Sequence, residues 1–542
     1  MMLSPWWCVM LAFEPSSIGQ ALSSLLPKRE SIAGMIVEYA RGGAGKSKSN
    51  NLPAGHPTNL RVPDVSVGGD PTMPEHLRSY LKLPKNKKKL MAIDDKFHFA
   101  LKLSDSLPSN RTMPDLRPES CQRIPAYTKA ELDRMPRTSV IFAQVDEPES
   151  TMRRSVASVI NHSPPELLEE VIIVDDGSEW PVAPSITALS PKVKVLALGE
   201  REGLIRARLR GFAIAKAPTV TFLDSHIECN PGWLEPLLSR LASHRALVIS
   251  PQVDMIDPAT LEHQTTYAQR GGFYLDGSLQ FTWFNPWDEQ HRLKAEKVAA
   301  ANGDPASSTP GIPKDAESML TPAIAGGLFS MWKSHFEHIG TYDTGMEVWG
   351  SENIEFSVRT WSCGGAMEIH PCSHVGHIFR VKSPPRPEAK RHSTLDYSCV
   401  NRARTTFVWF DEYSRYTDGN WAPVPNTDPA HPKFQPNYTV AGDAASLQTR
   451  HALRKSLACK PFEWYLQNVF SDHDLSEEMA NSTSGGFKDR CSRFDHFCGP
   501  PWAGIPRPTD EANPTSGALK RLCSSCAQFR AAEDAKKKAS AK

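Results

Sequence analysis

The chain has 542 residues, with 62 Lys and Arg against 61 Asp and Glu, so its formal net charge is +1. This near balance of charges gives no support for a nucleic-acid partner or for an anionic membrane surface. A chain of this length has room for roughly two or three domains and for a large buried core. The apolar start, residues 1–13, is too short to span a bilayer, so no membrane anchor is visible in this sequence.

The two ends of the chain differ in composition from its middle. Residues 1–110 are rich in Gly, Pro, Ser and Lys and lack apolar periodicity, so we expect a stem or a disordered arm there. Residues 415–455 are rich in Pro, Asn and Asp, and we expect irregular structure. The tail, residues 471–542, is polar, becomes Lys-rich and contains four cysteines, and its pattern predicts no particular fold.

The middle of the chain, residues 111–470, has the pattern of an α/β domain. From Thr138 onward, short apolar segments that predict buried strands alternate with helical segments. The strands are expected at residues 139–143, 170–176, 192–198 and 219–224, and the helices at 152–160 and 204–215. Strands that are apolar on both faces and separated by helices indicate a parallel sheet of the nucleotide-binding kind.

The second half of this domain predicts a more mixed arrangement. We expect a strand at residues 246–250, a loop near 301–322, a helix around 353–363 and a short helix at 463–469.

Two acidic motifs stand where predicted strands end. Asp175 and Asp176 close one strand, and Asp224-Ser225-His226 closes another. Ligands of open α/β sheets lie beyond the carboxyl ends of the strands, so we expect these motifs to meet at one crevice. Asp224 and His226 point the same way if the segment stays extended, and a divalent cation that bridges phosphates accepts such a pair. The alternative is that Asp224 caps the next segment and His226 is an ordinary surface residue.

Further candidates follow another apolar stretch. His377 could be a third metal ligand, and Arg380 could neutralise the charge that grows on a departing diphosphate. Either Asp175 or Asp176 could accept hydrogen bonds from uracil or ribose. Spacing alone does not separate these roles from those of ordinary strand-end residues.

Three other motifs each allow a functional and a structural interpretation. Arg201 begins a basic segment that could contact a nucleotide or simply start a charged helix. Gly326 and Gly327 permit close approach of the backbone to a sugar or to a neighbouring strand. Trp349 and Glu352 combine an aromatic platform with a carboxylate, or else are a buried Trp and a helix N-terminus that favours negative charge.

Longer motifs are more specific than these short patterns. They occupy residues 163–176, 201–211, 221–238, 270–273, 325–329, 340–353, 363–365, 371–380, 409–413 and 459–466. In these motifs the chain resembles the polypeptide N-acetylgalactosaminyltransferases, the family that initiates mucin-type O-glycosylation. The resemblance runs in order from residue 114 to residue 470.

The resemblance implies a GT-A fold with a Rossmann-like central sheet over residues 111–470, and an enzyme that depends on Mn²⁺. The implied donor is UDP-GalNAc and the implied acceptors are Ser and Thr hydroxyls of proteins. Family members retain the anomeric configuration by front-face displacement, in which the departing phosphate helps to deprotonate the acceptor. The protein then contributes positioning and charge stabilisation.

The resemblance also implies roles for individual residues. Asp224, His226 and His377 would be the metal ligands. Substrate contacts would come from Ala143, Asp176, Arg201, Ser225, Gly327, Trp349 and Arg380. Catalytic roles at the sugar and in a mobile loop would fall to Glu352, Asn353 and Trp349.

The cysteine pattern of the family implies two disulfides, Cys121 with Cys372 and Cys363 with Cys459. Such bonds would place the domain in an oxidising lumen, the Golgi, where a missing or atypical N-terminal segment would supply any membrane anchor. No lectin β-trefoil is evident in the sequence. The cysteines of the tail could form two local disulfides or a zinc knot, and an oxidising lumen favours the disulfides.

Two departures from the family pattern touch the donor side. Ser383 and Pro385 stand where the family has His and Tyr, and residues 144–148 replace a Phe-His-Asn-Glu-Ala motif. Two alternatives therefore stand beside GalNAc transfer. One is a catalytically silent relative that acts as a binding or scaffold protein, and the other is a transferase that uses another UDP-sugar.

Overall fold

The computed structural model describes residues 89–265, 269–274, 279–284, 289–302, 316–381, 397–411 and 444–471. These residues belong to one compact unit, Val62–Lys542. The predictions for residues 1–88, for Ser383 and Pro385, and for the cysteine-containing tail lie outside the described residues, as does most of the loop expected near 301–322.

The described strands build one large mixed sheet and one small hairpin. The large sheet has ten strands in the order β10-β12-β6-β11-β4-β1-β2-β3, with β5 paired to β12 and β7 to β6, whereas β8 and β9 pair with each other. The strands are β1 (Thr138–Gln144), β2 (Leu168–Asp175), β3 (Val193–Ala197), β4 (Thr219–Asp224), β5 (Ile227–Cys229), β6 (Leu247–Ile256), β7 (His263–Gln264), β8 (Arg270–Phe273), β9 (Phe281–Phe284), β10 (Met319–Leu320), β11 (Phe329–Trp332) and β12 (Ala366–Ile378).

The four strands predicted from Thr138 onward are confirmed, and they are mutually parallel in the order β3-β2-β1-β4. The continuation of the sheet is not purely parallel, because β11 runs antiparallel to both β4 and β6. A strand buried on both faces is apolar whichever way it runs, so the sequence pattern did not reveal this reversal.

The helices are α4 (Leu101–Ser106), α5 (Glu119–Gln122), α6 (Lys129–Leu132), α7 (Glu149–Asn161), α8 (Pro184–Thr187), α9 (Leu204–Ile214), α10 (Leu234–Ser243), α11 (Glu289–Ala301), α12 (Lys333–His338), α13 (Glu352–Ser362), α14 (Tyr397–Trp409), α16 (Ala444–Ser456) and α17 (Phe462–Asn468). The helices predicted at residues 152–160, 204–215, 353–363 and 463–469 correspond to α7, α9, α13 and α17.

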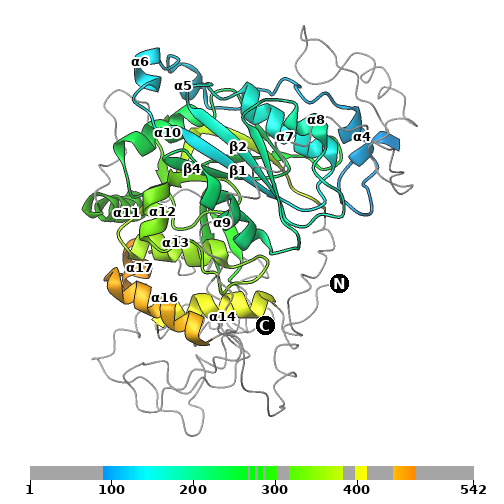
Figure 1. Ribbon diagram of the computed structural model, residues 1–542. Coiled ribbons are helices and arrows are strands. Elements are labelled where there is room, and N and C mark those ends of the chain that lie inside the picture. The colour runs from blue at the N-terminus through cyan, green and yellow to red at the C-terminus, as the bar shows by residue number, and fades with distance from the viewer. Residues whose placement is uncertain are drawn as a thin grey trace, which may run out of the picture. The chain divides into compact units, whose positions relative to one another are not determined.

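The irregular structure expected up to residue 455 is wrong for its last part, where α16 lies beside α14 (Figure 1). The Ala, Leu, Gln, Arg and Lys residues of α16 favour helix, and Leu447 is fully buried. The prediction failed because the Pro-rich composition of the residues before 444 was extended to the helix-favouring residues that follow.

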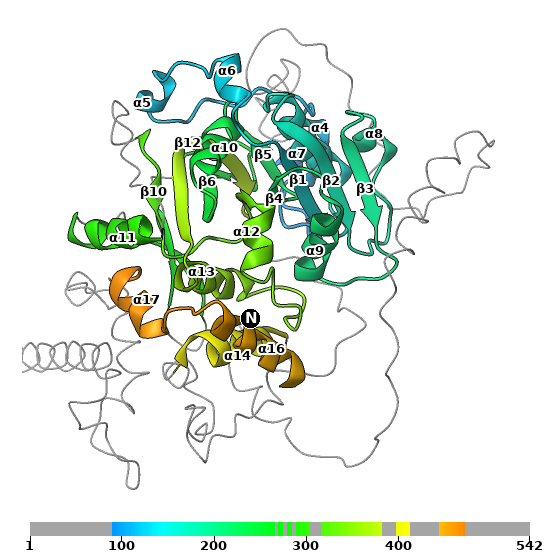
Figure 2. The ribbon, with the colours of Figure 1, turned by 60° about the vertical axis from the view of Figure 1, so that its left-hand side comes forward.

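Helices cover both faces of the sheet. Alternate side chains of a strand point to opposite faces. On β11, Phe329 packs against Phe356 of α13, whereas the indole of Trp332 donates to the carbonyl of Leu241 in α10 at 2.7 Å. Figure 2 shows α9, α12 and α13 grouped on one side of the strands. The sheet is therefore enclosed between two helical layers. Its carboxyl edge, where the parallel strands β1 to β4 end, is the place where ligands of such sheets bind.

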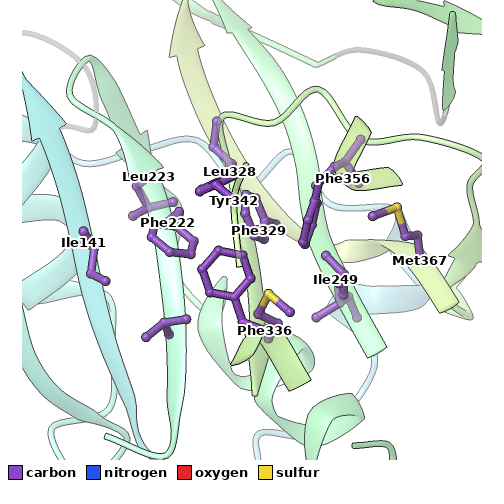
Figure 3. Close-up of a cluster of buried hydrophobic side chains, with 14 of the residues drawn as sticks. Ile141, Phe222, Leu223, Ile249, Leu328, Phe329, Phe336, Tyr342, Phe356 and Met367 are labelled. Atoms are coloured by element: carbon purple, nitrogen blue, oxygen red, sulfur yellow. The ribbon is translucent and has the colours of Figure 1, made fainter. Parts of the chain in front are cut away.

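An aromatic cluster fixes β4 and β11 against the helices on that side (Figure 3). Phe222 of β4 lies with its ring centre 5.1 Å from Phe329 and 5.8 Å from Phe336 of α12, and Tyr342 and Phe356 complete the group. All five rings are almost fully buried. Because β4 ends at Asp224, this cluster sets the position of a predicted site residue.

Part of the expected N-terminal arm is ordered against the domain. Phe97, Phe99 and Leu103 are buried together with Ile256 and Ile378 of the large sheet. The sequence did not predict this because the segment is short and follows a long polar stretch. The ordered domain therefore begins before the boundary expected at residue 110. Among the described helices, none is both long enough and apolar enough to cross a bilayer.

Both disulfides implied by the family resemblance are present. Cys121 pairs with Cys372 of β12, with Cα atoms 5.3 Å apart. Cys363, directly after α13, pairs with Cys459, and their Cα atoms lie 4.3 Å apart. The first bond ties the segment before β1 to the sheet, and the second ties α13 to the segment between α16 and α17.

Candidate active site

The predicted site residues converge at the carboxyl edge of the sheet. Asp224 ends β4 and pairs in register with Ala143 near the end of the parallel strand β1. His377 lies near the end of β12, which reaches the same edge because β12 is parallel to β6. Gly327 stands just before β11, whose antiparallel course brings its first residues beside the last residues of β4.

Asp224, His226 and His377 form a compact cluster of possible metal ligands. One ligand atom from each residue lies within 4.8 Å of the others. Nε2 of His377 is 3.3 Å from Oδ2 of Asp224, and the two imidazole rings have centroids 4.7 Å apart. The alternative of a capping Asp224 beside an ordinary surface His226 does not account for this convergence.

Glu147 orients one of these ligands. Its Oε2 lies 3.2 Å from Nδ1 of His226 and accepts a hydrogen bond from Ser225 Oγ at 3.1 Å. Nη2 of Arg380 donates to both oxygens of the same carboxylate, at 2.5 and 2.7 Å. A carboxylate on Nδ1 holds the ring in one orientation and directs Nε2 towards a metal. Glu147 therefore links the histidine to the arginine.

The charges in the cluster suit a cation. Burial by itself would raise the pKa of Asp224, but the hydrogen bond with His377 and the charge of Arg208 hold this pKa well below its usual range. Burial lowers the pKa of His377 despite the opposing effect of Asp224. The site therefore presents an ionised carboxylate beside a neutral imidazole, which are the protonation states that metal ligands require.

One carboxylate and two imidazoles fit a divalent transition metal such as Mn²⁺, which accepts both oxygen and imidazole ligands. A diphosphate also fits, because Nε of Arg380 is buried without a hydrogen-bond partner among the described residues. This donor lies on the same guanidinium that Glu147 holds beside His226.

Arg208 ties the Gly326-Gly327 turn to Asp224. This buried arginine of α9 donates to the carbonyl oxygens of both glycines, at 2.5 and 2.9 Å, and to Oδ1 of Asp224 at 3.1 Å. A Cβ atom on Gly327 would lie 2.3 Å from Oδ2 of Asp224. A Cβ atom on Gly326 would lie 2.6 Å from Cβ of Asn353. The two glycines are thus required by close approach to site side chains.

Asp175 ends β2 and Asp176 follows it, and the side chain of Asp176 is the one that faces the loop before α9. Asp175 is bonded to Gln144 and Ser178, whereas Asp176 accepts from the backbone amides of Glu202 and Gly203 at 2.6 and 2.9 Å. Burial raises the pKa of Asp176 to about 6, against the opposing effects of these amides and of the Arg201 charge. Arg201 lies beside this segment, because a Cβ atom on Gly177, the residue after Asp176, would be 2.7 Å from the backbone nitrogen of Arg201.

The segment around Trp349 supplies the remaining predicted residues. Trp349 is 49% exposed, so it is not the buried tryptophan of the structural alternative. Glu352 is buried at the first position of α13, accepts from the amide of Gly350 at 2.5 Å, and has a pKa raised by burial. Asn353 donates to the carbonyl of Ile324 at 3.1 Å, just before the glycine turn.

Two important residues were missed from the sequence. Glu147 lies three residues after the end of β1, at the same edge as the predicted strand-end acids, and this placement could have singled it out. Arg208 falls on the buried face of α9 together with Ile205 and Phe212, and a basic residue in an apolar stripe is a usable signal.

Comparisons with known proteins find matches over the residues that form this site. The family model described as "Glycosyl transferase family 2" matches residues 139–295, and the one described as "N-terminal domain of galactosyltransferase" matches residues 317–384. Polypeptide N-acetylgalactosaminyltransferase 13 of Rattus norvegicus is 39% identical over 387 residues, which are 70% of this chain and 61% of the relative. Probable N-acetylgalactosaminyltransferase 6 of Caenorhabditis elegans is 37% identical over 452 residues, covering 81% of this chain and 65% of the relative.

The chain belongs to the family of polypeptide N-acetylgalactosaminyltransferases. It also resembles a crystal structure of GalNAc-T7 with UDP, GalNAc and Mn2+, with a TM-score of 0.60 and 26% sequence identity, covering 85% of this chain and 75% of that one. The expected GT-A glycosyltransferase fold is thereby confirmed. The chain spans about three fifths of the length of the relative from Rattus norvegicus.

Proposed function

We propose that the protein transfers N-acetylgalactosamine from UDP-GalNAc to Ser and Thr hydroxyls of proteins, with retention, and so initiates O-linked glycosylation. The observation that carries this proposal is the cluster of Asp224, His226 and His377 at the carboxyl edge of a GT-A sheet, beside Arg380. Asp176 and Arg201 flank the same edge and would contact the nucleotide, together with the backbone of Ala143.

Mn²⁺ bound by the three ligands would supply positive charge to the diphosphate of the donor. Arg380 adds a fixed cation, and Glu147 prevents its guanidinium from turning away. Such preorganised charge stabilises a leaving group more in the transition state than in the ground state. Gly327, Glu352 and Asn353 would hold the sugar, and Trp349, which is half-exposed, would cover it.

The contacts of the carboxylates in the site bear on which retaining route the reaction would follow. Asp224 is bonded to Arg208, Glu147 to Arg380, and Glu352 to the amide of Gly350, so each is already engaged. We therefore favour front-face displacement over a covalent glycosyl-enzyme. The acceptor oxygen forms a bond to the anomeric carbon, the bond from that carbon to the phosphate oxygen breaks, and the acceptor proton passes to the departing diphosphate.

The natural site of this reaction would be the Golgi lumen. The two disulfides support an oxidising compartment, and protein acceptors in the secretory pathway would meet the enzyme there.

A donor screen tests the proposal. The purified chain is incubated with Mn²⁺, a Thr-rich peptide and each of several UDP-sugars, and the peptide mass is followed. We expect addition of one N-acetylhexosamine from UDP-GalNAc, an α-anomeric signal in the product, and no reaction in Asp224→Asn or with a peptide lacking Ser and Thr. Preference for another donor would identify a different sugar transferase. No transfer from any donor would instead favour the alternative of a catalytically silent relative that acts as a binding or scaffold protein.

A further inference from the structure

The segment that carries Trp349 has an unfavourable backbone conformation. Val348, Gly350 and Ser351 all have positive φ angles, of 50°, 103° and 63°. Residues with a side chain rarely adopt such angles unless surrounding contacts impose them. The contacts around this turn therefore show what holds it in place.

A single side chain on α14 spans the turn from one end to the other. Oδ1 of Asn401 accepts a hydrogen bond from the amide of Glu347 at 2.7 Å. Nδ2 of Asn401 donates to the carbonyl oxygens of Glu347 at 2.7 Å and Gly350 at 2.9 Å, and lies 3.3 Å from that of Trp349. Asn401 is fully buried, so water does not replace these bonds.

The same turn also orients Glu352. Gly350 is held at its carbonyl oxygen by Asn401 and donates its amide to Oε2 of Glu352 at 2.5 Å. Displacement of Gly350 would therefore withdraw a hydrogen bond that directs this buried carboxylate. A continuous set of contacts thus leads from α14 to the carboxylate assigned to the sugar.

The first part of the turn has supports that do not involve Asn401. Glu347 forms an ion pair with Arg206 of α9, with distances of 2.6 and 2.8 Å, and the carbonyl of Val348 accepts from the amide of Leu204 at 2.9 Å. These contacts join the turn to the nucleotide side of the site. Loss of Asn401 would therefore release mainly Trp349 and Gly350.

We propose that Asn401 is a positioning residue, which holds the turn at residues 347–350 so that Glu352 and Trp349 meet the donor sugar. The inference rests on the proposed function for its catalytic consequence, whereas the anchoring of the turn can be tested without any reaction. Asn401 itself contacts neither metal ligand nor substrate in this assignment. It acts through the backbone of the turn.

Three variants separate positioning from a general loss of structure. Asn401→Ala removes all the hydrogen bonds, and Asn401→Asp keeps the acceptor for the Glu347 amide but places a carboxylate against three carbonyl oxygens. Thr405→Val is the matched control, because Thr405 is equally buried one turn along α14. Among the described residues, its hydroxyl bonds only to the backbone carbonyl of Asn401, at 2.9 Å.

We expect both Asn401 variants to lose about 10- to 100-fold in kcat for sugar transfer, since small misplacement of reacting groups costs rates of this order. The Kd for UDP should change by less than about twofold, because the metal ligands, Asp176 and the Arg206–Glu347 pair are untouched. Hydrogen–deuterium exchange of residues 347–351 should accelerate in both Asn401 variants and stay unchanged in Thr405→Val.

Unchanged exchange of residues 347–351 in both Asn401 variants would overturn the anchoring role, whether or not the wild type transfers a sugar. Faster exchange with unaltered kcat would overturn the positioning role. A wild type that transfers no sugar refutes the proposed function alone, and the exchange measurement still decides whether Asn401 holds the turn.

Discussion

Glu147 provides the sharpest test of the site, because one buried carboxylate serves both a predicted metal ligand and a predicted phosphate contact. The side chains of Glu147 and Arg380 are 5% and 10% exposed, and His226 lies on the other side of the same carboxylate. Burial alone would raise the pKa of Glu147, but Arg380 and His226 lower it below the usual value, so the group is ionised. The substitution Glu147→Gln keeps the shape of this side chain and removes its charge.

Two losses are expected from Glu147→Gln. Removing one member of a buried ion pair costs about 3–5 kcal/mol, and the amide oxygen can still accept from Arg380, so we expect about 3 kcal/mol of unfolding free energy to be lost. The orientation of His226 is lost as well, and changes of this kind weaken metal binding about 10- to 100-fold. Urea unfolding measures the first effect and calorimetric titration with Mn²⁺ in the presence of UDP measures the second.

Glu228→Gln is the matched control. Glu228 is an equally buried carboxylate, but the partners of its side chain are Arg111 at 2.7 Å and Arg154 at 3.2 Å rather than His226. We expect a similar loss of stability with unchanged affinity for Mn²⁺. Equal metal affinities of Glu147→Gln and the wild type, or an equal loss in Glu228→Gln, would refute the reasoning.

Three further substitutions test other parts of the site. Gly327→Ala should weaken Mn²⁺ binding by about tenfold or more by displacing Asp224, whereas Gly199→Ala, where an added Cβ meets nothing within 4 Å, should leave calorimetric titrations unchanged. The pKa of Asp176 is raised from 3.8 to about 6, so the folded state binds the proton of this carboxyl more tightly than the unfolded state does. The free energy of unfolding of the wild type should therefore fall by about 3 kcal/mol, relative to Asp176→Asn, as the pH rises from about 4 to about 7. Urea unfolding at several pH values measures this, and the same pH dependence of the free energy of unfolding in both proteins would contradict it. Glu352→Gln should reduce kcat for transfer by about tenfold or more with little change in the Kd for UDP, and equal losses in both would argue against a sugar contact.

The sequence predicted the parallel half of the sheet because each strand and helix there has its own local pattern. The convergence of Asp224, His226 and His377 was foreseen partly from strand ends and mainly from the family resemblance, which also implied the two disulfides. Local patterns could not distinguish Asp175 from Asp176, since which of two adjacent acids faces the ligand depends on contacts with Gln144 and the loop before α9.

The residues that sequence reasoning missed act through long-range contacts. Glu147 meets His226 across 79 positions, and Asn401 meets Glu347 across 54. Glu147 lies in residues 144–148, where the sequence departs from the family motif, and Asn401 lies outside the matched motifs. A Glu or an Asn in isolation is most often an exposed polar residue. The ordered segment around Phe99 was missed for another reason, because its short apolar pattern follows a long polar stretch.

The two sides of the site are supported in different ways, and this difference has a functional consequence. Asp224 lies on β4 between β1 and β11, and His377 lies on β12 between β5 and β6, so paired strands flank these two of the three proposed metal ligands. Glu352 depends instead on a turn of strained backbone that one amide side chain spans. Displacement of the turn should therefore slow transfer while metal and UDP still bind, whereas displacement of the sheet edge should weaken binding and transfer together. A variant that loses donor binding through the turn alone would show that the two supports are not independent.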